Sequence, residues 1–438
     1  MPKKCKTFII STKLNKNKMI FPKLNKNLWQ LLGPSVVFVA LSLNGGEMLL
    51  WPDLVNKYGL FILWMVPVIL LLQFCVNLEI ERYTVATGEN TVSALIGFNK
   101  FFKVLFPLSV LISLMWPGWI SNSGNLLAFI IGFPQHGAII SVFLLLLILL
   151  IWFSKKSYNL MENMAKFGLF GVLLIGIFIL VASFQKGIPE IKVNFFPQTK
   201  DKILYVSALA FGGVAGVLNL VQSHWVMAKG YGASTFGKKT EFDWENKESN
   251  RNWNDWWKIL IKEHTVLFYF GNLFGIFLIA AVAFLTLTGA KVSGFGLITY
   301  QVNLLNNLYG IGWLWGIGII LLFFMAQMTI LDASGRLLHH SFPSIPSSKL
   351  SQYFGLIGVL ILAGIVFFPN FNQPSLLLQF SAFSSSFIMA LYPPFLLAMN
   401  LKLPKPVRPK LLNIIGIIAC SLFYLISTIW GVFGGIIF

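Results

Sequence analysis

The sequence predicts an all-α polytopic membrane protein, and three observations carry this prediction. Of the 438 residues, 56% are hydrophobic and only 11% are charged, and the mean hydropathy is +0.76. Soluble domains carry about 25% charged residues, so composition alone indicates an integral membrane protein. The apolar residues gather in long segments of the length that a helix needs to cross a bilayer, and not in the short alternating strands of a barrel.

Eleven segments of this kind follow one another along the chain. They cover residues 29–51, 60–83, 104–131, 138–153, 167–184, 203–227, 259–288, 308–332, 351–368, 375–400 and 411–436, and the fourth is short. Residues 1–28 precede them and are basic, without the apolar core and small-residue cleavage site of a signal peptide. We therefore expect a basic cytoplasmic tail followed by about eleven transmembrane helices.

The distribution of lysine and arginine predicts the orientation in the membrane. With a cytoplasmic N-terminus, most of the 33 Lys and Arg residues fall in cytoplasmic segments, as the positive-inside rule requires. The exception is the segment 185–202, which is lysine-rich although it would lie outside. Membrane orientation explains the net charge of +18 better than binding of nucleic acid, so we expect no nucleic-acid partner.

The longest polar stretch lies within residues 229–258, between the sixth and seventh segments. Its Trp-rich part, 237–258, is rich in acids, amides and tryptophans. We interpret it as a cytoplasmic connecting loop that partly lies at the membrane interface, with Trp253, Trp256 and Trp257 as anchors.

The chain lacks the sequence signatures of the common enzyme classes. No nucleophile elbow, phosphate-binding loop or HExxH helix occurs, and we expect no enzymatic activity. Cys5, Cys75 and Cys420 are scattered, without metal-binding or redox spacing.

Glycines interrupt two of the apolar segments, five segments apart. The first contains NGGE, Asn44–Glu47, and the sixth contains FGGVAG, Phe211–Gly216. Glycine interruptions at matching positions of two halves are typical of inverted-repeat transporters. We therefore expect two repeats of five spans, 29–184 and 203–400, each with a broken first helix, and an additional helix at 411–438.

The first interruption puts a carboxylate inside the bilayer. An unwound turn releases backbone carbonyls, which are ligands for hard cations, and Gly45 lets a ligand approach the backbone closely. Glu47 at the bilayer centre would cost about 2.5–3.5 kcal/mol on insertion scales, so it should face a partner, a cavity or a proton. The alternative is that the glycines allow close helix packing and that Glu47 forms a distant salt bridge.

The second interruption is followed by a polar helix face. Asn219, Gln222 and Ser223 are spaced i, i+3 and i+4 and share one side of a helix. Amide oxygens can bind a cation or a polar solute, but hydrogen bonding between helices explains Gln222 and Ser223 equally well. His224 can shuttle protons near neutral pH, with a purely structural histidine as the alternative.

Asp332 and Arg336 have the i, i+4 spacing of a helical ion pair near the cytoplasmic end of the eighth segment. They can form an inner gate or a plain interfacial salt bridge. Together with Gln222 and His224, they are our candidates for coupling or gating.

A longer stretch carries a family resemblance. GPSVVFVALSLNGGEMLLWPDLVNKYG, Gly33–Gly59, resembles the first helix and following loop of the Nramp metal transporters. The resemblance extends over most of the chain, through the number of spans, the cytoplasmic N-terminus and both interruptions. It implies a LeuT-type fold in a prokaryotic plasma membrane and, for the family at large, proton-coupled uptake of divalent transition metals.

The functional motifs of that family are altered here. Its first break reads Asp-Pro-Gly-Asn, whereas Asn44–Glu47 exchange the carboxylate and the amide. Its sixth helix carries Ala-x-x-Met-Pro-His, and the best match, Ala215–Leu220, puts Leu218 at the methionine. Without the thioether, an oxygen-only site suits magnesium, calcium or manganese better than softer metals.

The leading prediction is a monomeric secondary transporter, without a cofactor, that moves a divalent cation of the manganese or magnesium type inward by alternating access. Glu47, Asn44 and Asn219 would be the metal ligands, and the carbonyl of Ala215 or Gly216 would complete the site. Protonation of Glu47 would couple transport to H+, or the protein would be a uniporter. The alternatives are a transporter of a small organic solute with an amino group, and a sensor that binds without transport.

Overall fold

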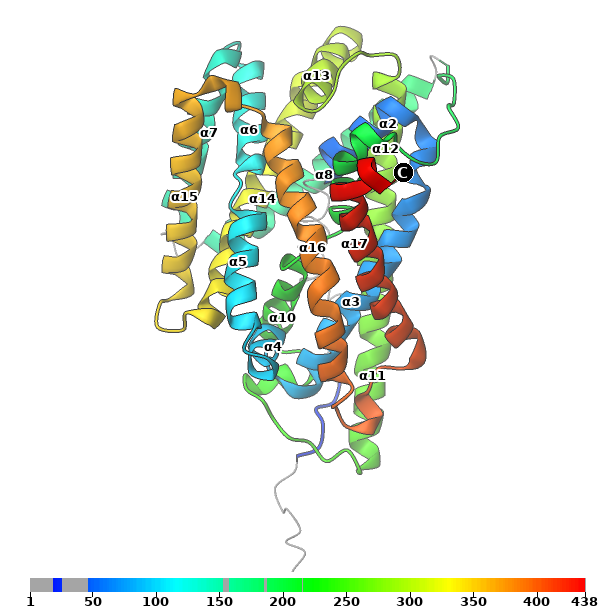
Figure 1. The fold of residues 1–438 in the computed structure, drawn as a ribbon, viewed down its shortest axis with the longest axis vertical. Coiled ribbons are helices and arrows are strands. Elements are labelled where there is room, and N and C mark those ends of the chain that lie inside the picture. Colours follow the sequence, from blue (N-terminus) through cyan, green and yellow to red (C-terminus); the bar gives the residue numbers. More distant parts are fainter. Residues whose placement is uncertain (1–18, 26–45, 153–156, 185–186, 215, 438) are drawn as a thin grey trace, which may run out of the picture.

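The computed structural model describes residues 19–25, 46–152, 157–184, 187–214 and 216–437. Its described part is a bundle of helices without a sheet, with one isolated bridge between Met19 and Phe242 (Figure 1). The expected first break falls on Asn44 and Gly45, which lie outside the described residues.

The first half of the chain contains the elements that follow this point. They are η1 (Gly46–Leu50), α2 (Trp51–Tyr58), η2 (Leu60–Trp64), α3 (Met65–Thr87), α4 (Thr91–Phe98), α5 (Phe102–Leu114), α6 (Gly118–Ile130), η3 (Pro134–His136), α7 (Gly137–Trp152) and α8 (Ser157–Phe184). Gly88, with φ 75°, ends α3, and the Asn90 side chain caps α4 by accepting from Val92 N. Pro117 separates α5 from α6, because proline lacks the N–H that a continuous helix needs.

The second half repeats the pattern of a short broken pair followed by long helices. Its elements are η4 (Thr199–Asp201), α9 (Lys202–Ala210), α10 (Leu218–Ala228), η5 (Gly232–Phe236), α11 (Lys247–His264), η6 (Thr265–Gly271), α12 (Asn272–Leu287), α13 (Phe295–Tyr309), α14 (Gly312–Ser341), α15 (Ser347–Phe367), η7 (Pro369–Phe371), α16 (Pro374–Asn400), η8 (Lys405–Val407) and α17 (Leu411–Ile437). The predicted break of the sixth span is confirmed, because α9 ends at Ala210 and α10 begins at Leu218.

Within the described ranges, eight helices are long and apolar enough to cross a membrane. The shorter apolar segment of α8, Gly168–Phe184, and the broken pair α9 and α10 correspond to the predicted fifth and sixth spans. The protein is therefore an integral membrane protein with the predicted all-helical architecture. Large apolar side chains on the outside, such as Leu360 and Phe367 at 71% and 80% exposure, belong to lipid-facing surfaces.

The interpretation of the Trp-rich stretch as an interfacial loop is wrong in part. Lys247–His264 form helix α11, which Asn246 caps and which continues through η6 into α12. Trp253 and Trp256 are buried rather than anchored at an interface, at 2% and 3% exposure. Asn252 donates to the carbonyl of Phe21, so this helix binds the described tail segment.

The two ends of the bundle differ in what they contain. α2 and α13 lie at one end, and α4, the start of α11 and the described tail segment lie at the other (Figure 1). α10 packs against α3, and η1 packs against α9, α12 and α16. The elements that follow the two predicted breaks, η1 and α10, therefore both pack among other helices of the bundle.

Candidate functional site

The second break is held open by a glycine conformation. Gly216 has φ +75°, a backbone conformation that other residues rarely adopt. A Cβ at this position would also lie 2.9 Å from Cβ of Ser385 on α16. The helix therefore cannot pass through this point as a regular α-helix, and α10 begins two residues later.

The carbonyls at the end of α9 are bonded by two other helices. Gln73 on α3 donates to Ala210 O at 3.2 Å and to the Tyr424 hydroxyl at 2.6 Å. Tyr424 on α17 in turn donates to Leu209 O at 3.1 Å. An unwound helix end inside a bilayer requires such partners, and they leave this end of the break well satisfied.

Asn219 lies in the first turn of α10 and is oriented by α3. Its Nδ2 donates to Oδ1 of Asn77 at 2.7 Å, and both residues are fully buried. The amide nitrogen is used, and the buried carbonyl oxygen Oδ1 has no hydrogen-bond partner among the described residues. A buried oxygen without a donor is what a neutral cation ligand provides.

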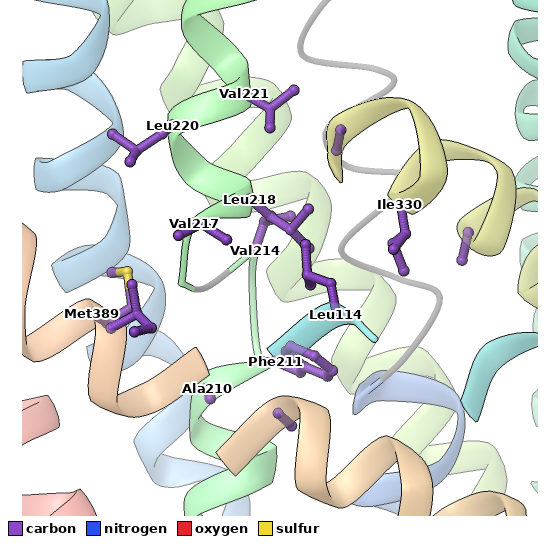
Figure 2. Close-up of a cluster of buried hydrophobic side chains, with 14 of the residues drawn as sticks. Leu114, Ala210, Phe211, Val214, Val217, Leu218, Leu220, Val221, Ile330 and Met389 are labelled. Atoms are coloured by element: carbon purple, nitrogen blue, oxygen red, sulfur yellow. The ribbon is translucent and has the colours of Figure 1, made fainter. Parts of the chain in front are cut away.

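The rest of the second break is lined by apolar side chains. Figure 2 shows Phe211, Val214, Val217 and Leu218 in one buried cluster with residues of α5, α14 and α16. Leu218, the position where the resemblance places methionine in the Nramp family, is 3% exposed and belongs to this cluster. Leu218 therefore offers no soft ligand, and the sulfur of Met389, on α16 in the same cluster, accepts from the Tyr392 hydroxyl.

Glu47 lies in η1, directly after the predicted first break, and is fully buried. The other predicted members of the site, Asn44, Gly45 and Ala215, lie outside the described residues. Across the described ranges, no group of three or more His, Cys, Asp or Glu side chains could hold a metal ion. A site at the breaks would therefore use one carboxylate with amide and backbone oxygens.

The predicted polar face of α10 is confirmed as a contact surface. Gln222 Nε2 donates to Glu81 Oε1 on α3 at 2.5 Å, and Ser223 accepts from Asn90 at 2.9 Å. Asn219 and Gln222 therefore both face α3. The sequence did not predict the contact between Gln222 and Glu81.

His224 has a partner that the sequence did not predict. Its Nε2 lies 3.1 Å from Nε2 of His340 on α14, and Nδ1 of His340 lies 2.7 Å from the Ser93 hydroxyl. One imidazole must donate to the other, so the pair holds one hydrogen between its two rings. The predicted ion pair between Asp332 and Arg336 is present, at 2.7 Å within α14.

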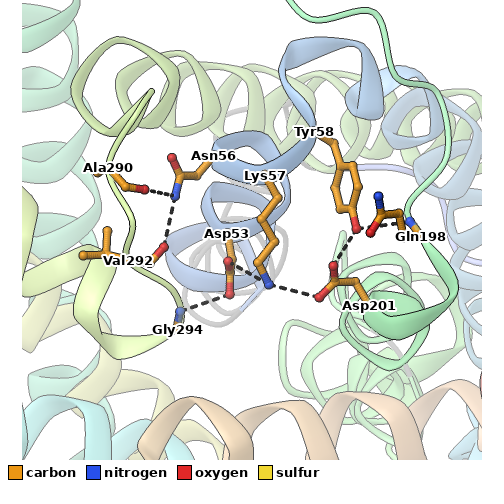
Figure 3. Close-up of polar contacts among 9 residues, drawn as sticks. All are labelled: Asp53, Asn56, Lys57, Tyr58, Gln198, Asp201, Ala290, Val292 and Gly294. Atoms are coloured by element: carbon orange, nitrogen blue, oxygen red, sulfur yellow. Dashed lines mark hydrogen bonds and ion pairs between the residues drawn. The ribbon is translucent and has the colours of Figure 1, made fainter.

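The opposite end of the bundle carries a network that joins three segments (Figure 3). Lys57 on α2 lies 3.3 Å from Asp53 and 3.1 Å from Asp201 in η4. Tyr58 donates to the same Asp201 at 2.5 Å, and Asp53 accepts from Gly294 N at 3.0 Å. The element after the first break is thus tied to the start of α9 and to the loop before α13.

Hydrogen bonds and charges adjust the pKa values of this network. Burial raises the pKa of Asp201, but the bonds from Tyr58 and Lys57 outweigh burial and bring it below its usual value. Burial and the bond to Asp201 raise the pKa of Tyr58 to about 12. Burial lowers the pKa of Lys57, and the charge of Asp53 with the Asp201 bond outweighs this and raises it. The i, i+4 spacing of Asp53 and Lys57 was the only sequence signal for this network.

Comparison with known proteins gives a fold but no sequence family. No protein-family model and no curated protein matches the chain. Among solved structures, the manganese transporter of Eremococcus coleocola in complex with an aromatic bis-isothiourea compound is similar, with a TM-score of 0.68 and 14% identity over 97% of this chain and 92% of that chain. The chain shares the fold of this structure.

Two further structures share this fold at lower similarity. Mhp1, a nucleobase-cation-symport-1 family transporter with bromovinylhydantoin bound, has a TM-score of 0.56 and 11% identity over 91% of this chain and 92% of that chain. MhsT in complex with L-phenylalanine has a TM-score of 0.53 and 12% identity over 94% of this chain and 98% of that chain. The predicted LeuT-type architecture and the resemblance to Nramp-like transporters are confirmed at the level of the fold.

Proposed function

We propose that this protein is a secondary transporter of divalent metal cations of the manganese or magnesium type, working by alternating access across the cell membrane. The two repeats, 29–184 and 203–400, would supply one broken helix each. Glu47 would provide the charge, and Asn219 with Asn44 and released backbone carbonyls would provide neutral oxygens. The N-terminus would lie in the cytoplasm, as the lysine and arginine distribution predicts.

The observation that carries this proposal is the orientation of Asn219. Its amide nitrogen donates to Asn77, and its buried oxygen Oδ1, directly after the break at Gly216, has no donor among the residues that the structure describes. Such an oxygen is stabilised by a cation or by a donor from a solute, and an unpaired buried acceptor costs about 1–3 kcal/mol. The fully buried Glu47 makes a cation the better partner, because it supplies the charge that a divalent ion requires.

An organic solute remains the second candidate, because the cluster of Figure 2 surrounds the break with apolar side chains. Such a lining suits the body of a small solute, with Glu47 bonded to its amino group. Thermal-shift measurements with manganese, magnesium and a panel of amino acids and amines separate the two. Stabilisation by amines alone would favour the solute.

Uptake into proteoliposomes tests the proposal. Purified wild-type protein should accumulate manganese or magnesium, and Glu47→Gln should reduce uptake at least tenfold, since the isosteric amide removes only the charge. Asn219→Ala should weaken uptake by a smaller factor. Glu89→Gln is the matched control. Glu89 bonds to Tyr83 and Lys239, and the variant should transport normally. Folded wild-type protein that moves neither ion would overturn the proposal.

A further inference from the structure

Glu81 is a buried acid whose contacts are incomplete. It lies on α3 with 1% exposure, and its Oε1 accepts from Gln222 Nε2 at 2.5 Å. Among the described residues, no lysine or arginine is bonded to it. The adjacent Glu79 differs in this respect, because Arg82 donates to it at 2.8 Å.

Two atoms of this contact are left without a hydrogen bond. Oε2 of Glu81 and Oε1 of Gln222 are both buried, and neither has a hydrogen-bond partner within the described part of the chain. Both are acceptors, so they cannot satisfy each other while Glu81 is ionised. Buried acceptors without donors are rare in native proteins and call for an explanation.

One proton satisfies both atoms. A protonated Oε2 of Glu81 becomes a donor, and the oxygen of the amide that already donates to Oε1 is an acceptor that needs one. The acid and the amide then form a cyclic pair with two hydrogen bonds, N–H to Oε1 and O–H to the amide oxygen. The opposite orientation of the Gln222 amide also requires a protonated Glu81. In that orientation the amide oxygen would face Oε1, and a proton would have to lie between these two oxygens.

The charges around Glu81 favour the same conclusion. On α11, Glu263 is close enough for its charge to act on Glu81, and His264 Nδ1 lies 3.9 Å from Oε1. Tyr231, before η5, is close to both acids. α10 contributes only the neutral amide of Gln222. Two neighbouring carboxylates inside a bilayer disfavour double ionisation.

On the other side of α3, the titratable groups are engaged elsewhere. Glu79 and Arg82 bond to each other, and Asn400 on α16 donates to Glu79 at 2.8 Å. The Arg82 guanidinium also lies over the ring of Trp257 at 3.9 Å and donates to Val407 O at 3.0 Å. Its charge is therefore directed away from Glu81.

We propose that Glu81 is a proton-binding site, and that its proton completes a cyclic hydrogen-bonded pair with the Gln222 amide and so fixes α10 against α3. The pair lies one helical turn from Asn219, which α3 also holds, through Asn77. α3 thus contacts the half-helix after the second break at a cation ligand and at a proton site. Release of the proton removes the O–H bond of this pair, leaves only the bond from Gln222 Nε2 to Oε1, and puts a second negative charge beside Glu263.

This assignment moves the proton from Glu47, where the sequence placed it, to a separate carboxylate. Its use as the coupling proton of metal uptake rests on the proposed transport function. The proton site itself does not, and a measurement on folded protein without any flux can test it.

Infrared difference spectroscopy on the purified, lipid-reconstituted protein detects the proton directly. Wild type should show the carbonyl-stretch band of a protonated carboxylic acid at neutral pH, and Glu81→Gln should lose it, because the second amide replaces the acid and keeps both hydrogen bonds. Glu89→Gln, the matched control, should retain the band. A spectrum in which Glu81→Gln removes no carboxylic acid band would overturn the proposal, whether or not the protein transports metal.

A second variant covers the case in which Glu81→Gln does not fold. Gln222→Met removes the amide partner and leaves the acid, so the band should remain but shift to higher frequency, since its O–H loses the amide acceptor. A band at the wild-type frequency in Gln222→Met would show that the acid is not bonded to this amide and would also overturn the proposal.

Discussion

Two regions of the molecule differ in what surrounds their buried acids: the network at the α2 end, and the site of Glu81 and Glu263 beside α10. Asp53 and Asp201 share the ammonium group of Lys57, with further donors from Tyr58 and Gly294 (Figure 3). Glu81, by contrast, has a neighbouring acid and one amide donor.

The difference indicates what each region does. Charges that are paired and bonded hold segments together without any change of protonation, and here they join α2, η4 and the loop before α13. A buried acid without a bonded cation is stabilised by taking up a proton. We call the network of Asp53, Lys57, Tyr58 and Asp201 the clasp, because it links separate segments. Glu81 is instead a site whose state depends on a proton.

The largest effect is expected at Glu79, the acid close to Glu81 that is paired with Arg82. Arg82→Met should destabilise the protein by about 3–5 kcal/mol, because it leaves Glu79, at 0% exposure, as a buried charge without its cation. The double variant Glu79→Met and Arg82→Met should recover most of this loss. Thermal unfolding in detergent measures both, and a double variant no more stable than the single one would contradict the pairing.

Breaking the clasp should have a smaller effect. Lys57→Met should cost about 1–3 kcal/mol, since Asp53 is 3% exposed but Lys57 itself remains in contact with water. Lys57→Arg should retain part of the stability through its own charge. Urea unfolding of the three proteins in detergent gives the order, and equal stability of Lys57→Met and wild type would show that the clasp does not contribute.

Removing the charge of Glu81, which has no bonded cation among the described residues, should not lower the stability of the protein. Glu81→Gln should change stability by less than about 1 kcal/mol, or raise it, because the amide reproduces the bonds of the protonated acid at no charge cost. The same thermal measurement applies. A loss as large as that of Arg82→Met would mean that Glu81 is an ionised partner in a salt bridge.

The smallest effect concerns the pH dependence of the clasp. The pKa of Asp201 is lowered on folding, so its contribution is present above the ordinary aspartate value of about 3.9 and is lost as pH falls through the lowered value. Because Asp201 is partly exposed, water screens the effect to less than about 1 kcal/mol. Unfolding midpoints of wild type and Asp201→Asn, measured from neutral to acidic pH, should converge in acid. A constant difference across that range would exclude this contribution.

The spans, the second break and the polar face of α10 were predictable because they depend on local patterns. Hydropathy identifies helices, glycine identifies the interruption at Gly216, and helical spacing places Asn219 and Gln222 on one side. The contacts were not predictable in this way. The meeting of His224 with His340, and of Lys57 with Asp201, depends on how distant helices pack, and no periodicity along the chain encodes that.

The Trp-rich stretch was misinterpreted for a related reason. Tryptophans near charged residues are common at membrane interfaces, but here Trp253 and Trp256 pack inward on α11, against the segment around Phe21. Their burial depends on a chain segment more than two hundred residues away.

Simultaneous recording of manganese and proton influx into proteoliposomes tests the division of roles between Glu47 and Glu81 most directly. Wild type should move both ions inward, Glu47→Gln should move neither, and Glu81→Gln should move manganese down its gradient without the accompanying protons. Wild-type vesicles that take up no manganese would contradict the cation site at Glu47, and coupled proton influx that persists in Glu81→Gln would contradict the role of Glu81 in coupling.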